Sequence, residues 1–335
     1  MAHCLFYLGA KVMGMKKINI LLALLITLAG LWAIPAQSQL PSSHILVSCF
    51  LDELLTVVDA RAIRVVNKIS VQQIANIAVS PDNKFLAAGI FNRPYMPIFE
   101  MPSLRPGTTS RGEHLKSIKA MEFSRDSARL YILSSEDSTL YELHVPSFNL
   151  IRSLKLQFYQ PEAMILTKDC TKMYITHPEV GAVSIIDLLE WQYAGDIRFQ
   201  GHISGIALSP DEKKLCVLYP NESLLNIYDA ESIKPIGTAP TERGACQVKV
   251  NDNNVAIVLN SVSNSISIIN INNTLDRRIL QVGNGPRDVL LMPGGQGCYV
   301  ANYTSGDLSV IDLNSIRQLG RLAVGRGACC LRWMQ

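Results

Sequence analysis

Short runs rich in Val, Ile and Leu recur along this chain at a nearly constant spacing, and this repeat limits the possible folds more than any other feature. An apolar residue in the first run of each copy returns after 41 to 44 residues. In one copy, residues 285–327, three such runs are separated by segments rich in Pro, Gly, Ser and Asn, which is typical of strands joined by tight turns. The apolar marker stands at Ile77, Met121, Met164, Ile206, Val248, Val289 and Leu331.

A second marker, the residue that closes the third run of each copy, also occurs seven times. One sheet of this size cannot bury both of its faces, so the copies must stack against one another. A period of about 40 to 45 residues with several strands per copy is typical of a β-propeller blade. The sequence therefore predicts an all-β fold, a seven-bladed β-propeller. The second marker stands at Asp59, Glu100, His144, Asp187, Asp229, Asn270 and Asp312.

The two markers are out of phase at the ends of the chain. The second marker begins at Asp59, before the first apolar marker, whereas the apolar marker ends at Leu331 with no later copy of the second. We therefore expect residues 328–333 to form the first strand of a blade whose other strands are residues 44–49, 54–59 and 65–71. A blade shared by the N- and C-terminal strands closes the ring and leaves only short sheet edges. In the next blade, residues 106–112 predict a loop in place of a clean fourth strand.

Three segments of the last complete copy match a known repeat. Residues 299–302 read Tyr-Val-Ala-Asn, residues 310–312 read Val-Ile-Asp, and residues 324–325 read Val-Gly. This pattern resembles the YVTN-type β-propeller repeat, and the resemblance extends over residues 42–335. It implies the propeller fold. It does not select an activity, because similar proteins include binding modules, surface-layer proteins and subunits of periplasmic enzymes.

The N-terminal segment predicts export. Two lysines follow Met15, residues 18–32 are almost wholly apolar, and the small residues Ala36 and Ser38 come next. This order is typical of a signal peptide, here residues 1–38 with Met15 as the true start, cleaved after Ser38. A retained membrane anchor is the alternative, although the apolar run is shorter than the ~20 residues of a usual span. We expect residues 39–335 to be one periplasmic or extracellular propeller with no membrane span.

Cleavage would also change the net charge. The leader holds three lysines and no acidic residue, so 28 of the 31 basic residues would remain against 28 acidic ones. A chain with no net charge has no general attraction to nucleic acid or anionic lipid. We therefore expect no general nucleic-acid binding.

Seven cysteines would remain after cleavage, and export permits disulfides. The register of the last blade, with Asp288 opposite Asn302, places Cys330 opposite Cys49 in the ring-closing blade. We predict a Cys49–Cys330 disulfide, with Cys329 as the substitute after a one-residue shift and free buried thiols as the alternative. A bond across nearly the whole domain could stabilise it by about 4 to 5 kcal/mol. We expect no metal, and no Cys-x-x-Cys-His motif is present to attach a c-type haem.

The residues that begin the innermost strand of each blade are expected to face a common channel mouth. Among them, Lys119, Glu162 and Arg287 could form a mixed-charge ring that holds a small anion or a peptide carboxylate. Ordinary solvated loop charges are the alternative. His177 and Asn302 occupy the Asn position of the repeat and are further ligand candidates, although a lone His is often only a hydrogen-bonded turn residue. The seven mouth positions are Ala75, Lys119, Glu162, Ser204, Cys246, Arg287 and Cys329.

Linear motifs of catalysis are missing. The chain has no Gly-x-Ser-x-Gly, no Gly-x-x-x-x-Gly-Lys and no His-Glu-x-x-His. We therefore expect an exported recognition or scaffold module, without a cofactor, that binds an envelope protein, a peptide or a small ligand at its loop face. The alternative is an enzyme: a periplasmic hydrolase, similar to a lactonase, or the propeller subunit of a periplasmic oxidoreductase.

Overall fold

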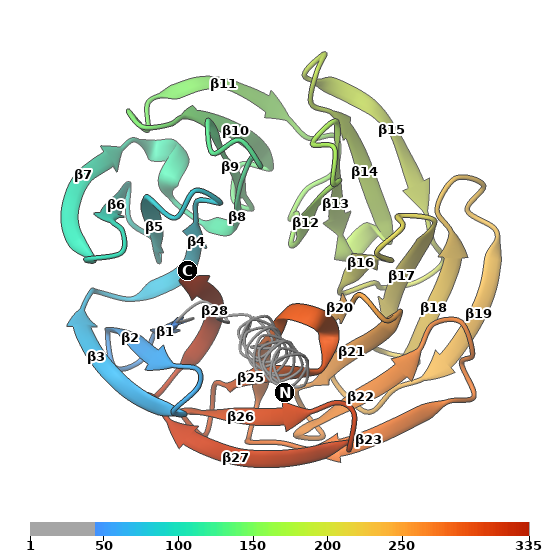
Figure 1. Ribbon diagram of the computed structural model, residues 1–335. Helices are drawn as coiled ribbons and strands as arrows, with labels where there is room; N and C mark the ends of the chain where they lie inside the picture. The colour runs from blue at the N-terminus through green and yellow to red at the C-terminus, as the bar shows by residue number, and fades with distance from the viewer. Residues whose placement is uncertain (1–43, 335) are drawn as a thin grey trace, which may run out of the picture. The chain divides into compact units, whose positions relative to one another are not determined.

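The computed structural model describes residues 44–334, which form seven four-stranded antiparallel sheets arranged in a ring (Figure 1). The prediction of a seven-bladed β-propeller is therefore confirmed. The predicted signal peptide, residues 1–38, lies outside the described residues. Within residues 44–334, no helix is long and apolar enough to cross a membrane.

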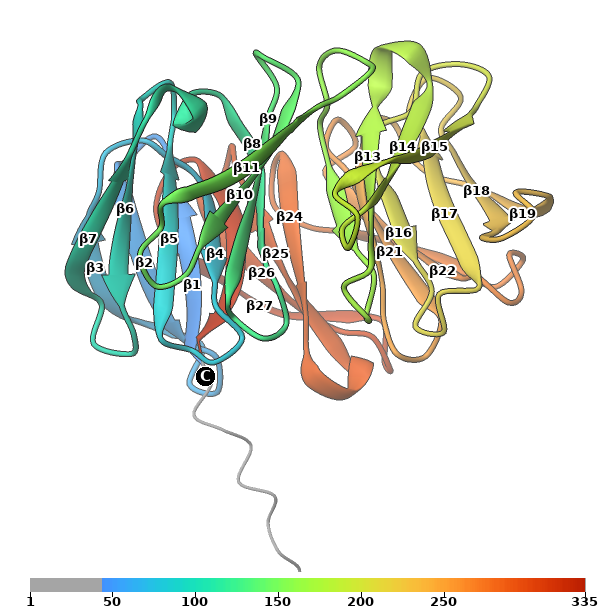
Figure 2. The ribbon, with the colours of Figure 1, turned by 90° about the horizontal axis from the view of Figure 1, so that it is seen from above.

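Every blade runs from an inner strand beside the axis to an outer strand at the rim (Figures 1 and 2). We number the blades along the chain, starting with the ring-closing one. Blade 1 contains β28 (Ala328–Met334), β1 (His44–Cys49), β2 (Leu54–Asp59) and β3 (Arg64–Ser70). Blade 2 contains β4 (Ile74–Val79), β5 (Phe85–Ile90), β6 (Tyr95–Glu100) and β7 (Arg105–Arg111). Blade 3 contains β8 (Ile118–Phe123), β9 (Arg129–Ser134), β10 (Thr139–His144) and β11 (Leu150–Lys155).

The remaining blades follow the same order, from the inner to the outer strand. Blade 4 contains β12 (Met164–Leu166), β13 (Lys172–His177), β14 (Ala182–Asp187) and β15 (Gln192–Arg198). Blade 5 contains β16 (Ile206–Leu208), β17 (Lys214–Tyr219), β18 (Leu224–Asp229) and β19 (Pro235–Pro240). Blade 6 contains β20 (Ala245–Val250), β21 (Val255–Asn260), β22 (Ser265–Asn270) and β23 (Arg277–Gln281). Blade 7 contains β24 (Pro286–Leu291), β25 (Gly297–Asn302), β26 (Asp307–Asp312) and β27 (Arg317–Ala323). The connections of the described chain also include the short 3₁₀ turns η1 (Glu113–Leu115), η2 (Pro178–Val180) and η3 (Pro293–Gly295).

Blade 1 joins the two ends of the chain, as predicted. Strand β28 pairs antiparallel with β1, so that Val47 lies opposite Leu331 (Figure 1). Blade 7 then holds the closed blade by hydrogen bonds: the Tyr299 hydroxyl donates to the Ala60 carbonyl at 2.8 Å, and the Trp333 indole donates to the Leu291 carbonyl at 3.0 Å. Blade 1, which closes the ring, is therefore hydrogen-bonded to blade 7 through both its N-terminal and its C-terminal segments.

The hydrophobic core lies between neighbouring blades. Leu46 and Leu55 of blade 1, for example, share one buried cluster with Ile74, Ile77 and Leu86 of blade 2. The middle strand β2, for example, is buried on both faces, because its sheet is covered by a blade on each side, whereas the outer strand β3 is largely exposed. Packing of copy against copy thus supplies the burial that no single blade can achieve.

Blade 2 has a complete fourth strand, so the prediction of a loop at residues 106–112 is wrong. Strand β7 pairs with β6 from Tyr95 opposite Arg111 to Glu100 opposite Arg105. Pro106 lacks an N–H group, but an outer strand has one free edge and tolerates that loss. Proline and glycine in this segment therefore mark a sheet edge and not a break in the sheet.

Candidate functional site

The inner strands of five blades carry a β-bulge at the same repeat position, where one extra residue is left out of the pairing. This residue is Lys119 in β8 and Arg287 in β24, for instance, since Ile118 and Ala120 have partners on β9 and Lys119 has none. Bulges re-aim side chains at the ends of strands. The bulged residues are Ala75, Lys119, Cys246, Arg287 and Cys329.

A turn residue in the left-handed backbone region precedes each bulge by two positions. Gly285 has φ 64°, and its carbonyl accepts a hydrogen bond of 2.8 Å from the N–H of Tyr303 in the same blade. A Cβ atom on Gly285 would lie 2.5 Å from Thr304 Oγ1, so this turn requires glycine. The turn fixes the start of β24 and therefore the direction of Arg287.

All seven predicted mouth positions line one cavity of about 1010 Å³. Two of them, Glu162 and Ser204, come from blades 4 and 5, whose inner strands are short. Hydrogen bonds continue the pairing there, since the N–H of Glu162 donates to Thr176 O at 3.0 Å. The predicted common opening therefore exists, and we call these seven residues the mouth. Ligand binding by them stays a prediction.

The three charged mouth residues are not equivalent. Lys119 Nζ lies 3.3 Å from Glu162 Oε1, an ion pair between blades 3 and 4 whose side chains are 39% and 45% exposed. Arg287 is exposed on the opposite wall, and none of the ion pairs formed within residues 44–334 includes it. The mouth therefore presents one neutralised pair and one cation without an acidic partner.

Two further layers of side chains line the channel below the mouth. The layer directly below is mostly small or uncharged, with Asp288 as the exception. The deeper layer, one residue after the apolar marker, is charged in three blades: Glu122, Lys249 and Arg332. The small layer comprises Asn76, Ala120, Ala163, Gly205, Gln247, Asp288 and Cys330.

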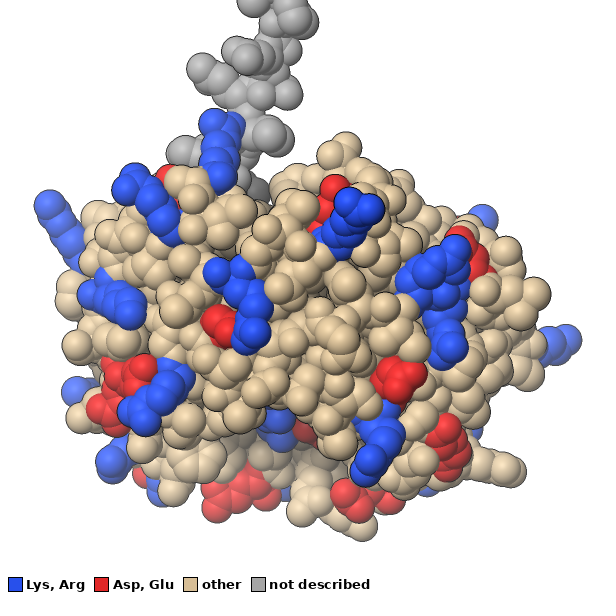
Figure 3. Space-filling model, turned by 90° about the horizontal axis from the view of Figure 1, so that it is seen from below, with Lys and Arg blue, Asp and Glu red and all other residues tan. Residues whose placement is uncertain are grey.

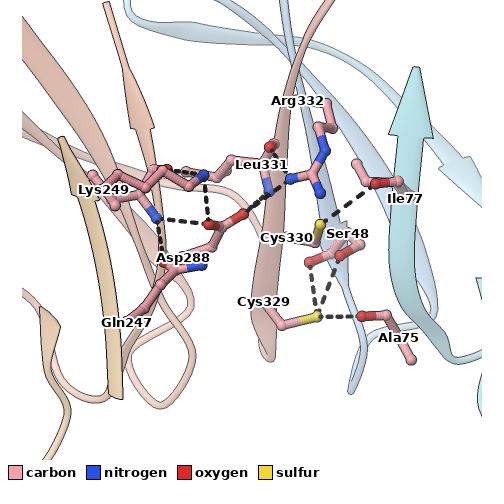
Figure 4. A network of polar contacts seen from close by, with 11 residues as sticks. Ser48, Ala75, Ile77, Gln247, Lys249, Asp288, Cys329, Cys330, Leu331 and Arg332 are labelled. Carbon is pink, nitrogen blue, oxygen red and sulfur yellow. Dashed lines mark hydrogen bonds and ion pairs between the residues drawn. The ribbon is translucent and has the colours of Figure 1, made fainter. Parts of the chain in front are cut away.

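Asp288 anchors a network that joins blades 6, 7 and 1 (Figure 4). Its carboxylate lies 3.2 Å from Lys249 Nζ and 3.4 Å from Arg332 Nη1, and it accepts a hydrogen bond of 2.8 Å from the N–H of Leu331. Burial raises the pKa of Asp288, but Lys249, Arg332 and these hydrogen bonds outweigh it and hold the pKa below its ordinary value. Asp288 is thus an ionised and fully bonded acid.

Glu122 lies in the same channel without such bonds. It comes from blade 3, is open to the cavity, and forms no hydrogen bond or ion pair with another residue in the part of the chain that the structure describes. The surrounding protein raises the pKa of Glu122 by desolvation, opposed by Arg332 and Lys249. Sequence reasoning missed this residue, although the charged residues one position after the apolar marker, Glu122 among them, were a usable signal.

His177 and Asn302, the two further ligand candidates, are buried inside their blades and do not line the channel, and ligand binding by them stays a prediction. Asn302 Nδ2 donates to Ser309 Oγ at 3.0 Å, and His177 Nε2 lies 2.9 Å from Ser184 Oγ. Each bond joins residues seven positions apart and connects the second and third strands of its blade. Burial lowers the pKa of His177 to about 4, so the ring is neutral at physiological pH. These positions stabilise hairpins.

The predicted Cys49–Cys330 disulfide is absent, and both residues are free thiols. The bulge at Cys329 shifts the register by one residue, so Ser48 and not Cys49 lies opposite Cys330. Cys49 Sγ points into its own hairpin, 3.7 Å from Thr56 Oγ1, whereas Cys330 Sγ points to the Ile77 carbonyl of blade 2 at 3.8 Å. The substitute, Cys329, is also free, with its sulfur 3.2 Å from Ser48 Oγ (Figure 4).

Two of the thiols, Cys246 and Cys329, lie at the mouth. Burial raises the pKa of both, to about 12 for Cys329, so they are protonated at neutral pH. Metals bind the thiolate and not the thiol. Within residues 44–334, no three His, Cys, Asp or Glu side chains are grouped so that they could hold a metal ion.

The outer side of the ring differs from the channel. On the side that Figure 3 shows, Lys and Arg residues alternate with Asp and Glu residues over a mostly uncharged surface. Single-sign patches of the kind that attract polyanions are not visible on that side. An uneven distribution of charge is instead found inside the mouth, between the Lys119–Glu162 ion pair on one wall and Arg287 on the other.

The fold and the site define a class: a seven-bladed β-propeller with a charged central channel. No family model matches the chain, so the resemblance to the YVTN-type repeat stays a prediction. No curated protein matches it in sequence.

Solved structures share the fold at low sequence identity. A hydrazine synthase chain of Kuenenia stuttgartiensis is 16% identical with a TM-score of 0.72, and the match covers 85% of this chain and 99% of that one. A protein from Lactobacillus plantarum is 13% identical with a TM-score of 0.72, covering 88% and 99%. The dihydro-heme d1 dehydrogenase NirN, solved in complex with DHE, is 12% identical with a TM-score of 0.67, covering 89% and 77%. At these identities the likeness concerns the fold alone.

Proposed function

We propose that this protein is an exported recognition module whose channel mouth binds the carboxylate of a peptide or small ligand. The observation that carries the proposal is the guanidinium of Arg287 at the mouth of the cavity, which forms no ion pair with any residue of the range 44–334. Arginine matches a carboxylate in charge and in its paired hydrogen-bond geometry. A cation without an acidic partner is therefore available to a ligand.

The position of Arg287 supports a ligand role over a structural one. A required glycine turn and a bulge hold its backbone, so the side chain is not needed to build the strand. The other mouth cation, Lys119, is already neutralised by Glu162. The cavity of about 1010 Å³ is at the upper end of the range of small-molecule and peptide pockets.

The test measures whether binding depends on a terminal carboxylate. The purified protein is titrated with a fluorescein-labelled random hexapeptide pool carrying a free C-terminal carboxylate, and with the same pool carrying a C-terminal amide, by fluorescence polarisation. We expect the free acids to bind more tightly, and Arg287→Leu to weaken their binding by about ten- to a hundredfold, the size of a charge-assisted hydrogen bond.

A matched control removes an arginine of the same blade at the far end of its sheet. Arg317 begins the outer strand β27 and does not line the cavity, so Arg317→Leu changes the net charge equally without touching the mouth. We expect this variant to bind as the wild type does. Equal binding of acids and amides, or equal losses in both variants, would rule the proposal out.

A second candidate is the propeller subunit of a redox assembly. Two of the similar structures, hydrazine synthase and NirN, carry the names of redox enzymes, and this favours the assembly over a free-standing hydrolase. Under this candidate, the protein purified from its native envelope would co-elute with a partner that absorbs visible light. Elution as a single colourless chain would count against it.

A further inference from the structure

Three aromatic side chains occupy one repeat position in three consecutive blades. This position directly follows the last residue of the second strand, at the loop beside the mouth. Blades 7, 1 and 2 place Tyr303, Phe50 and Phe91 there, and we call these residues the aromatic arc. The other four blades have Ser135, Pro178, Pro220 and Ser261 at this position.

The aromatic arc belongs to the same cavity as Arg287. All three of its residues line that cavity, and blade 7 supplies both Tyr303 and Arg287. Phe50 and Phe91 form an edge-to-face pair across the boundary between blades 1 and 2, with ring centroids 5.7 Å apart. An apolar surface thus lines the same cavity as Arg287.

The arc is held rigidly although it is partly open to solvent. The N–H of Phe50 donates to Gly327 O at 2.9 Å, that of Phe91 to Gln73 O at 3.0 Å, and Tyr303 makes the equivalent bond. Phe91 is nonetheless 55% exposed, and Leu51, which follows Phe50 in the sequence, is 51% exposed. Exposed apolar groups on a fixed backbone next to a cavity are typical of a binding surface.

We propose that the aromatic arc is the specificity subsite for a bulky apolar side chain next to the carboxylate that Arg287 binds. The ligand class is then a peptide C-terminus whose last residue is aromatic or a large aliphatic. This inference rests on the proposed function of Arg287. A peptide is favoured over a single aromatic acid because the open cavity, about 1010 Å³, extends past the arc to the Lys119–Glu162 wall.

Four labelled hexapeptides test the inference, differing only at their ends. They end in Phe or in Gly, each as the free acid and as the amide, and their affinities are measured by fluorescence polarisation. We expect the wild type to bind the Phe acid about tenfold more tightly than the Gly acid, and Phe91→Ala to reduce this preference to about twofold. The preference of acid over amide should survive Phe91→Ala and be lost in Arg287→Leu.

The control is another exposed aromatic residue that lies outside the cavity lining. Tyr159, in the loop between blades 3 and 4, is 59% exposed, and Tyr159→Ala should leave all four affinities unchanged. Phe91→Leu retains an apolar surface and should keep most of the preference for Phe. A denaturation midpoint of Phe91→Ala equal to the wild type excludes unfolding as the cause.

The possible failures are distinguishable. If acids bind better than amides but Phe and Gly ends bind alike, the arc is not a specificity subsite and the role of Arg287 stands. If acids and amides bind alike, the proposed function fails together with this inference. Unlabelled peptide and N-acetyl-phenylalanine are also compared as competitors of the labelled Phe peptide. If both displace it at the same concentration, the ligand is a single aromatic acid and not a peptide.

Discussion

The two walls of the central channel use their carboxylates in opposite ways. On the wall made by blades 6, 7 and 1, Asp288 is buried and bonded to Lys249, Arg332 and the Leu331 backbone (Figure 4). On the facing wall, Glu122 of blade 3 is open to the channel and has no bonded partner within residues 44–334. The pKa is shifted downward for Asp288 and upward for Glu122.

This difference distinguishes charged groups that stabilise the fold by bonding to other residues from charged groups that are free to bind a ligand. Asp288 connects the last blade to the strand that closes the ring, so its bonds contribute to ring closure. Glu122 bonds to no other residue that the structure describes, and it is left for water or a ligand. The same contrast recurs at the mouth in the cations, since Lys119 is paired with Glu162 and Arg287 has no ion pair within the described part of the chain. Each of the following predictions changes one wall and leaves the other intact.

The largest effect is expected from Asp288→Asn. It leaves Lys249 and Arg332, which are about one third exposed, without their carboxylate, and we expect a loss of about 3 kcal/mol in the free energy of unfolding. Denaturant unfolding followed by tryptophan fluorescence measures it. Glu162→Gln makes the same chemical change in the exposed pair of the other wall and should cost at most about 0.5 kcal/mol. Equal losses would refute the contrast between the walls.

Acid should remove the contribution of Asp288. Because its pKa is lower in the folded than in the unfolded state, the carboxylate stabilises the fold fully above the ordinary value of about 3.9, and the stabilisation is lost as pH falls through the lower folded value. The gap in unfolding free energy between wild type and Asp288→Asn should therefore be constant from pH 7 to 5 and shrink towards pH 2. A gap that grows with acidity would contradict the assigned direction.

The ring, its closure and the seven mouth residues could be predicted because repeat period and strand order are properties of the sequence. The bulge could not. It adds one residue to the inner strand without changing the repeat length, and this one residue is why Ser48, and not Cys49, lies opposite Cys330. Likewise, the repeat reveals that His177 replaces an Asn, but only the hairpin geometry shows that its ring bonds to Ser184.

Glu162→Gln should have a second, smaller effect, on binding. It releases Lys119 from its ion pair, so the mouth gains a second available cation. We expect free-acid peptides to bind about two- to threefold more tightly at low salt, because an exposed ion pair contributes a free energy of that size. The gain should disappear at high salt, where exposed charges are screened. Adding Lys119→Gln to this variant should return the affinity to that of the wild type. An unchanged affinity in the single variant would mean that the ligand does not reach this wall.

The smallest effect, opposite in sign to that of Asp288→Asn, is expected from Glu122→Gln. Since the folded state raises the pKa of Glu122, this carboxyl group lowers stability as the pH rises above its unfolded pKa, and the loss is complete above the folded pKa. Replacing the carboxyl group by a neutral amide should raise the unfolding free energy at pH 7 by about 0.5 kcal/mol, because the open channel still hydrates the side chain. At pH 4 the wild-type carboxyl is largely protonated, and the two proteins should be equally stable. A loss of stability at pH 7 would instead mean that Arg332 and Lys249 hold Glu122 as firmly as they hold Asp288, and the two walls would then form one charge network.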